Sequence, residues 1–168
     1  TGEYARRHGV INNLSAWDPA NVTFFEQLAA AGYRCGYIGK WHMPGALPDL
    51  RGVDTFITFT IDEGQGVYTD CPLVINGVDV ERPGTYVSTD LTDLALDWLA
   101  AGDPAQPTCL FLAHKAVHHP FSPPGDLEGV YADEPLMDMP DEAFTDQPLL
   151  ERNVWEGTAG QLSTVYQR

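Results

Sequence analysis

Two short apolar segments, each preceded by an amphipathic helix, most constrain the fold of this chain. The segments are CGYI at residues 35–38 and TCLFLA at residues 108–113. The first is short and apolar enough to form a strand that is buried on both faces of a sheet, and the second begins as a buried strand. Helices that alternate with such strands predict an α/β fold with a mostly parallel sheet flanked by helices.

The predicted helices are recognisable from their ends and their apolar faces. The first begins after Thr23, which forms a capping box with Glu26, and Gly32 fits its C-terminal stop. The second runs from residue 88 or 89 to about residue 100, with Asp90 and Asp93 near its N-terminus. Its predicted apolar stripe consists of Leu91, Leu94, Ala95, Trp98 and Leu99.

Three further segments complete the predicted organisation. Residues 56–60 predict another strand. Residues 73–80, LVINGVDV, carry Asn-Gly between β-rich flanks and predict a β-hairpin insert. The chain after Pro120 is rich in Pro, Asp and Glu, so residues 132–168 are expected to be loop-like.

The charge balance excludes several classes of partner. The chain has 24 acidic and 9 basic residues, which gives a net charge of −15. Nucleic-acid binding depends on Lys and Arg that neutralise phosphates, and anionic membranes would also repel this surface. No apolar run approaches the roughly 20 residues that span a bilayer. We therefore expect neither nucleic acid nor a membrane as partner, and an anionic substrate would need a locally basic pocket.

The three cysteines indicate buried thiols better than a metal or redox centre. Cys35, Cys71 and Cys109 show no CxxC spacing, so zinc and thioredoxin-like interpretations fail. Cys35 and Cys109 lie within the apolar strand segments, where a buried thiol is the expected state.

Lysine and histidine side chains follow both predicted strands. Lys40 and His42 come after the first strand, and four further residues come after the second: His114, Lys115, His118 and His119. Ligands of open parallel sheets bind beyond the carboxyl ends of the strands. Histidine transfers protons near neutral pH, and lysine stabilises an oxyanion. The pattern predicts a site for an anionic group such as sulfate or phosphate.

The histidine-rich segment allows two other interpretations. One is a turn with partly exposed imidazoles at residues 118–120, and the other is metal binding by several histidines. Metal binding is disfavoured because no carboxylate or cysteine sits at a recognisable ligand spacing nearby. The chain also lacks a GxSxG elbow, a Walker loop and an HExxH motif, which leaves serine hydrolase, nucleotide and zincin functions without support.

Several motifs resemble the type I sulfatase family of the alkaline-phosphatase-like superfamily. They are TGEYARRHGV, GYRCGYIGKWH and HKAVHHPFSPP, and the spacing of the first two is also similar to the family pattern. GQGVYTD, LVINGVDV and STDLTDLALDWL resemble the branch that contains glucosamine-6-sulfatases and related carbohydrate sulfatases. The resemblance implies part of an alkaline-phosphatase-like sandwich, with residues 1–168 as a partial sulfatase catalytic domain and residues 1–131 recognisable.

The resemblance also implies a mechanism and its catalytic residues. The family uses a formylglycine made from the Cys or Ser of a Cys/Ser-x-Pro-Ser-Arg motif, and a Ca2+ ion that holds the sulfate. By position, Lys40 would contact the formylglycine hydrate and a sulfate oxygen. His42 would take a proton during sulfate release, and His118 would assist the leaving oxygen.

The remaining candidates are assigned to substrate binding. Lys115 and His114 are expected to face the sulfate or to support the residues that do. His119 stands where relatives often have a small residue, which leaves the register of the two adjacent histidines open. Gln65 and Tyr68 lie in the GQGVY segment, where substrate contact and loop packing are both open.

The chain also departs from the family pattern. None of its cysteines is followed by x-Pro-Ser-Arg, so the nucleophile motif is expected upstream of Thr1, and the family metal ligands upstream of it and after Arg168. We therefore expect the central part of a sulfatase, without turnover by itself and with exposed sheet edges that favour oligomers. Periplasmic, secreted and lysosomal locations are all compatible with the family.

The expected function is hydrolysis of sulfate esters on a sulfated carbohydrate by the intact enzyme. A phosphonate monoester or phosphodiester hydrolase of the same superfamily is the alternative, since the same cationic groups suit either ester. A third hypothesis is a non-catalytic remnant that binds anions or a partner through the same residues.

Overall fold

The computed structural model describes residues 1–12 and 14–135. The chain divides into two compact units, Thr1–His119 and Pro120–Arg168. The described part of the second unit consists of turns and bends, and most of the predicted loop-like segment at residues 132–168 lies outside the described residues. The sheet, the helices and the candidate site all belong to the first unit.

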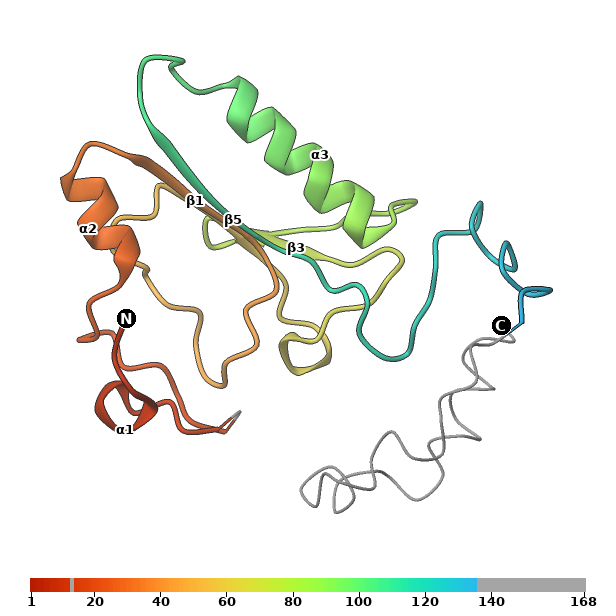
Figure 1. The fold of residues 1–168 in the computed structure, drawn as a ribbon, viewed down its shortest axis with the longest axis horizontal. Helices are drawn as coiled ribbons and strands as arrows, with labels where there is room; N and C mark the ends of the chain where they lie inside the picture. The colour runs from red at the N-terminus through yellow and green to blue at the C-terminus, as the bar shows by residue number, and fades with distance from the viewer. Residues whose placement is uncertain (13, 136–168) are drawn as a thin grey trace. The chain divides into compact units, whose positions relative to one another are not determined.

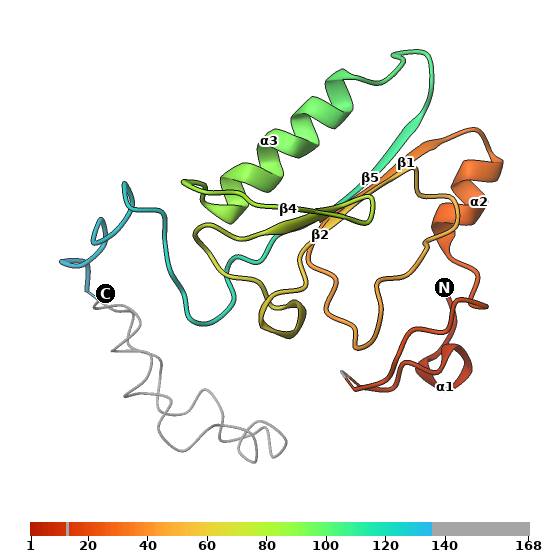
Figure 2. The same ribbon diagram turned by 180° about the vertical axis from the view of Figure 1, so that it is seen from behind.

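A five-stranded sheet with the order β4-β3-β2-β1-β5 forms the framework of the first unit (Figure 1). Its strands are β1 (Arg34–Gly39), β2 (Thr55–Thr58), β3 (Leu73–Ile75), β4 (Val78–Val80) and β5 (Thr108–Ala113). β1 pairs in parallel with β2 and β5, whereas β3 pairs antiparallel with β2 and β4. Figure 2 shows the hairpin side of the sheet from behind. The parallel core and the hairpin insert confirm the predicted α/β fold.

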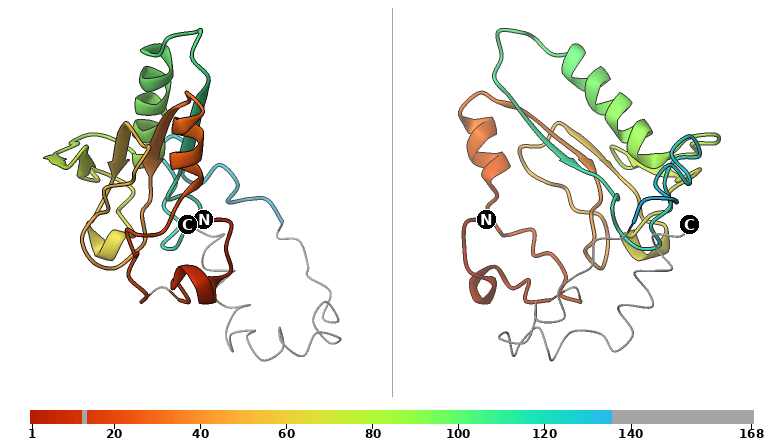
Figure 3. Two further views of the ribbon diagram at one scale, coloured as in Figure 1. Left: turned by 90° about the vertical axis from the view of Figure 1, so that its left-hand side faces the viewer. Right: turned by 45° about the vertical axis from the view of Figure 1, so that its right-hand side comes forward.

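Two helices cover opposite faces of this sheet (Figure 3). They are α2 (Phe24–Ala30) and α3 (Val87–Ala100), while the short α1 (Ala5–His8) precedes them and the 3-10 helix η1 (Asp62–Gly64) follows β2. No helix among the described residues is long and apolar enough to cross a bilayer.

The two faces of β1 belong to different hydrophobic clusters because successive strand residues point to opposite sides. Cys35 and Tyr37 pack with Phe25 of α2 in one cluster. Ile38 packs with Trp98 of α3 in the other, larger cluster. The prediction that this strand is buried on both faces is therefore confirmed.

The helix predictions are confirmed with small corrections. Thr23 and Glu26 form the predicted capping box, in which the Thr23 N–H donates to Glu26 Oε1 at 3.2 Å. α3 begins one residue before the predicted range. Leu99 does not belong to its apolar stripe, since it is 45% exposed. Asp90 is buried instead, and its carboxylate pairs with Arg82.

The prediction that β5 is a buried strand is wrong. Phe111 and Leu112 are exposed by 45% and 38%, and Cys109 is half-buried where a buried thiol was expected. The reason is the position of β5 at the end of the strand order, with β1 as its partner strand in the described sheet. Cys35, in the central strand, is buried as predicted.

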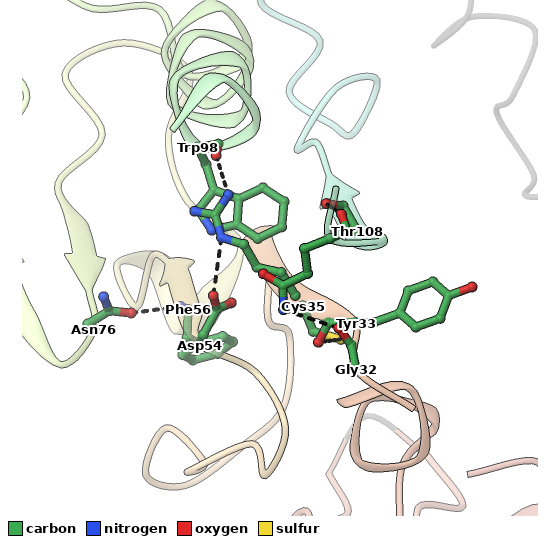
Figure 4. Close-up of polar contacts among 10 residues, drawn as sticks. Gly32, Tyr33, Cys35, Asp54, Phe56, Asn76, Trp98 and Thr108 are labelled. Carbon is green, nitrogen blue, oxygen red and sulfur yellow. Dashed lines mark hydrogen bonds and ion pairs between the residues drawn. The ribbon is translucent and has the colours of Figure 1, made fainter. Parts of the chain in front are cut away.

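Arg34, at the start of β1, contacts Trp98 and Asp54, which are labelled in Figure 4. The Arg34 guanidinium lies 4.0 Å from the centre of the Trp98 ring, and its Nη1 donates to the Trp98 carbonyl oxygen at 2.6 Å. Its Nε pairs with Asp54 at 3.3 Å. These contacts join β1, α3 and the loop before β2 at the end of the sheet opposite the predicted site.

Candidate anion-binding site

The register of β1 and β5 brings the two cationic strand ends together. The strands pair residue by residue from Arg34 with Thr108 to Gly39 with Ala113. The Lys40 N–H then donates to the Ala113 carbonyl oxygen at 2.7 Å, which extends the pairing by one step. The segments that follow both strands therefore leave the sheet at the same edge, as the sequence predicted.

This close approach of the two strand ends requires glycine at position 39. Gly39 has a φ of +122°, and a Cβ atom there would lie 1.9 Å from the Ala113 carbonyl oxygen. No other residue type fits without a shift of the backbone. The Gly-Lys pair of the GKWH motif thus positions the lysine directly after the strand.

Gln65 is the centre of the polar network at this edge. Its Oε1 accepts a hydrogen bond from Lys40 Nζ at 2.5 Å, and its Nε2 lies 2.8 Å from His42 Nε2. Its backbone carbonyl oxygen accepts a hydrogen bond from Lys115 Nζ at 3.0 Å. The side chain for which substrate contact and loop packing were both open therefore contacts both candidate residues of the GKWH motif.

The two glycines that flank Gln65 allow its loop to approach the GKWH segment. Gly64 and Gly66 have φ values of +83° and +70°. A Cβ atom on Gly64 would lie 2.9 Å from the Trp41 carbonyl oxygen, and one on Gly66 would lie 2.6 Å from the Phe59 ring. The GQG sequence is thus explained by close packing on both sides of the glutamine.

Lys115 is buried against the loop that carries Gln65. It is only 3% exposed, and its ammonium lies 5.0 Å from the centre of the Tyr68 ring. The Tyr68 hydroxyl donates to the His118 carbonyl oxygen at 2.5 Å, and the His118 N–H donates to the Lys115 carbonyl oxygen at 3.0 Å. Tyr68 therefore joins the GQGVY segment to the turn that carries the histidines.

The other histidines occupy different surroundings. His118 and His119 are exposed, and His118 Nδ1 lies 2.7 Å from the His119 carbonyl oxygen. The alternative of a turn with exposed imidazoles is thus an accurate description of this segment. His114 is half-buried, and its buried Nδ1 has no hydrogen-bond partner in the described part of the chain.

Two residues outside the predicted set, Tyr37 and Trp41, stabilise the segment that carries Lys40 and His42. The Tyr37 hydroxyl donates to the Lys40 carbonyl oxygen at 2.5 Å, and burial raises the pKa of Tyr37 to about 12. Trp41 packs against Tyr37, Phe56 and Trp17. A tyrosine inside an apolar strand gives no sequence signal of such a contact.

The electrostatics of the site differ from those of the rest of the chain. The chain's two lysines are Lys40 and Lys115, and neither has a carboxylate oxygen within 4.0 Å among the described residues. Burial lowers the pKa of Lys40, the charge of Lys115 lowers it further, and Asp62 opposes both. The two lysines therefore form no ion pair within 4.0 Å among the described residues, and Asp62 acts on Lys40 only from a greater distance.

The same environment favours a neutral His42. Burial lowers the pKa of His42, and the charges of Lys40 and His118 lower it further, while Glu63 acts in the opposite direction. With a pKa below the ordinary 6.5, the imidazole is mostly neutral at pH 7 and is available to accept a proton.

The described residues fit an anion and do not fit a metal ion. They contain no group of three or more His, Cys, Asp or Glu side chains that could hold a metal. Cys35 and Cys71 are buried, and burial raises the pKa of both thiols, so neither resembles a reactive nucleophile.

Together these features define a class of protein: an α/β domain that gathers lysine and histidine side chains at the carboxyl ends of parallel strands. The chain belongs to the sulfatase family, whose family model, described as Sulfatase, matches residues 1–145.

Individual relatives agree with this assignment. The chain is 28% identical to N-acetylglucosamine-6-O-sulfatase of Bacteroides thetaiotaomicron over 131 residues, which cover 78% of this chain and 23% of that protein. It is 32% identical to arylsulfatase J of Mus musculus over 122 residues, which cover 62% of this chain and 20% of that protein.

A solved structure also matches the fold. It is a protein in complex with its substrate D-glucosamine-2-N,6-O-disulfate, and it matches with a TM-score of 0.77 and 27% identity over 86% of this chain and 28% of that chain. The chain thus spans between 20% and 28% of the length of these three proteins.

Proposed function

We propose that the protein hydrolyses sulfate esters and that Lys40, His42 and Lys115 surround the sulfate group. The observation that carries the proposal is that neither lysine forms an ion pair among the described residues, although the chain has a net charge of −15. Like charges placed together without a counter-ion oppose folding, so such an arrangement favours a ligand-binding role. Sulfate supplies the missing negative charge.

Each group has a defined task in the proposed reaction. Lys40 has three N–H donors, one of which faces Gln65. The other two are free to face sulfate oxygens and to stabilise negative charge that develops on them. Hydrolysis forms an S–O bond to an attacking hydroxyl group and breaks the S–O bond to the alcohol. The neutral His42 accepts the proton of the hydroxyl group, and the exposed His118 donates a proton to the alcohol oxygen that leaves.

We infer sulfated glucosamine as the class of substrate. One relative is named N-acetylglucosamine-6-O-sulfatase, and one structural neighbour was solved with D-glucosamine-2-N,6-O-disulfate as its substrate. The motifs GQGVYTD and LVINGVDV, which resemble the same branch, lie beside the site or on the hairpin next to β2.

The Ca2+ ligands and the formylglycine precursor that the family resemblance implies are expected outside this chain. The described residues contain no group of three or more His, Cys, Asp or Glu side chains that could hold a metal ion. We therefore assign no step of the reaction to either group.

The test is hydrolysis of glucosamine 6-sulfate and of a matched phosphonate monoester by the complete protein. We expect cleavage of the sulfate ester to be the faster reaction. Faster cleavage of the phosphonate would favour the alternative hydrolase, and cleavage of neither ester would leave an anion-binding role.

A substitution at Lys40 tests the site itself. We expect Lys40→Ala to lower kcat/KM on the sulfate ester by on the order of 10²-fold or more, the scale of a lost oxyanion partner. Arg6→Ala is the matched control, because it removes one positive charge from an exposed side chain outside the network. Equal rates for the two variants would exclude the proposed role of Lys40.

A further inference from the structure

We propose that Gln65 is a positioning residue that holds the Lys40 ammonium and the His42 imidazole side by side at the site. This inference rests on the proposed function, because it assigns Gln65 a task in the same site. The Gln65 amide contacts both Lys40 and His42.

The partners of the amide determine its orientation. A lysine ammonium has only donors, so the group that faces Lys40 Nζ at 2.5 Å must be the Gln65 oxygen. The NH2 group consequently faces His42, with Nε2 at 2.8 Å and Nδ1 at 3.3 Å. The amide nitrogen is close to both ring nitrogens, so it lies against the face of the imidazole, and the contact holds the ring in place in either neutral tautomer.

The glutamine is held in place by its backbone as well as by its side chain. Lys115 Nζ donates to its carbonyl oxygen, and the flanking glycines pack against Trp41 and Phe59. The loop therefore has little freedom to turn the amide away without losing these contacts.

The charged groups around His42 explain why residue 65 carries an amide and not a carboxylate. Lys40, His118 and Glu63 act electrostatically on His42, and His8 and Thr1 line a cavity of about 350 Å³ that His42 also lines. A glutamate at position 65 would stabilise the protonated form of His42 and would form an ion pair with Lys40. The chain has 24 acidic residues. An uncharged glutamine at position 65 leaves His42 able to accept a proton and leaves the positive charge of Lys40 unpaired by residue 65.

The decisive variant is Gln65→Glu, which has the same shape and adds a negative charge. A carboxylate within hydrogen-bonding distance raises the pKa of a histidine by about 1 unit or more. We expect the acidic limb of the kcat/KM profile, which begins below pH 6.5 in the parent protein, to move to higher pH by that amount. Gln65→Met removes both hydrogen bonds of the amide without adding charge. For this variant we expect a smaller shift of the acidic limb and a lower kcat/KM.

Gln106→Glu is the matched control because it makes the same change of charge at the opposite end of the sheet, where Gln106 donates to the Gly32 carbonyl oxygen. We expect its pH profile to match that of the parent protein. An equal shift in both variants would show a general charge effect and would overturn the assignment of Gln65.

A measurement without substrate separates this inference from the proposed function. The pKa of His42 is measured by NMR of the complete protein labelled at histidine, with a His42→Asn variant to assign the resonance. A raised pKa of His42 in Gln65→Glu alone supports the positioning role even if no sulfate ester is cleaved. An unchanged pKa of His42 in that variant would overturn the inference even if the parent protein is an active sulfatase.

Discussion

Replacing Gly39 by alanine tests the link between the β1–β5 pairing and the site. A Cβ atom at this position would lie 1.9 Å from the Ala113 carbonyl oxygen, and such contacts are essentially never shorter than 3.0 Å. The two groups must therefore separate by at least 1.1 Å, the difference between these distances. If the oxygen moves that far from Lys40 N, their 2.7 Å hydrogen bond lengthens to about 3.8 Å and is lost.

The expected destabilisation follows from three contributions. The lost hydrogen bond contributes about 1 kcal/mol, and the carbonyl group left without a partner adds roughly 1–3 kcal/mol where water cannot reach it. The positive φ of +122° adds about 1–2 kcal/mol for a residue with a Cβ atom. We expect a total of roughly 3–6 kcal/mol. Because Lys40 is displaced by about 1 Å, we also expect sulfate-ester turnover to fall by on the order of 10²-fold.

The assay combines guanidinium unfolding with amide hydrogen exchange of the β1 and β5 peptides in the complete protein. Gly32→Ala is the matched control, because Gly32 also has a positive φ, +90°, but a Cβ atom added there would meet nothing within 4 Å. We expect Gly32→Ala to cost only the conformational contribution of about 1–2 kcal/mol and to leave exchange at Lys40 slow. Equal destabilisation by the two substitutions would refute the steric argument.

Two further substitutions test a buried ion pair of α3 and a hydrogen bond beside the site. We expect Asp90→Asn to lower the unfolding free energy by about 1–3 kcal/mol in guanidinium, because it breaks a pair whose carboxylate side chain is 4% exposed while Arg82 is 28% exposed; a change within 0.5 kcal/mol would contradict this. We expect Tyr68→Phe to cost about 1 kcal/mol and to lower kcat, since the hydroxyl that holds the His118 carbonyl oxygen is lost. Unchanged thermal stability and kcat would show that this hydrogen bond contributes nothing.

Local signals in the sequence predicted the elements of the fold. The capping box of Thr23 and Glu26 marked the start of α2, and Asn76-Gly77 marked the hairpin between β3 and β4. Both are interactions within a few residues, so the sequence carries them directly. The apolar run before Lys40 likewise predicted the central strand.

Apolar composition alone did not reveal which strand is central. β1 and β5 are similarly apolar, yet β1 is buried and β5 has exposed residues such as Phe111. The difference arises from the strand order, which depends on contacts between distant parts of the chain. Leu99 is a second example. Its periodic position on α3 predicted burial, but the side chain is exposed in the structure.

The sequence by itself determined the residue types of the site, the parallel strands that carry them and the resemblance to sulfatases. Only the tertiary structure decided that Gln65 joins these residues. Its partners Lys40 and Lys115 are 25 and 50 positions away in the chain, and no local pattern encodes their separation in space. The register of β1 with β5 and the close packing of Gly64 and Gly66 bring the three together, because backbone atoms can approach so closely only at these glycines.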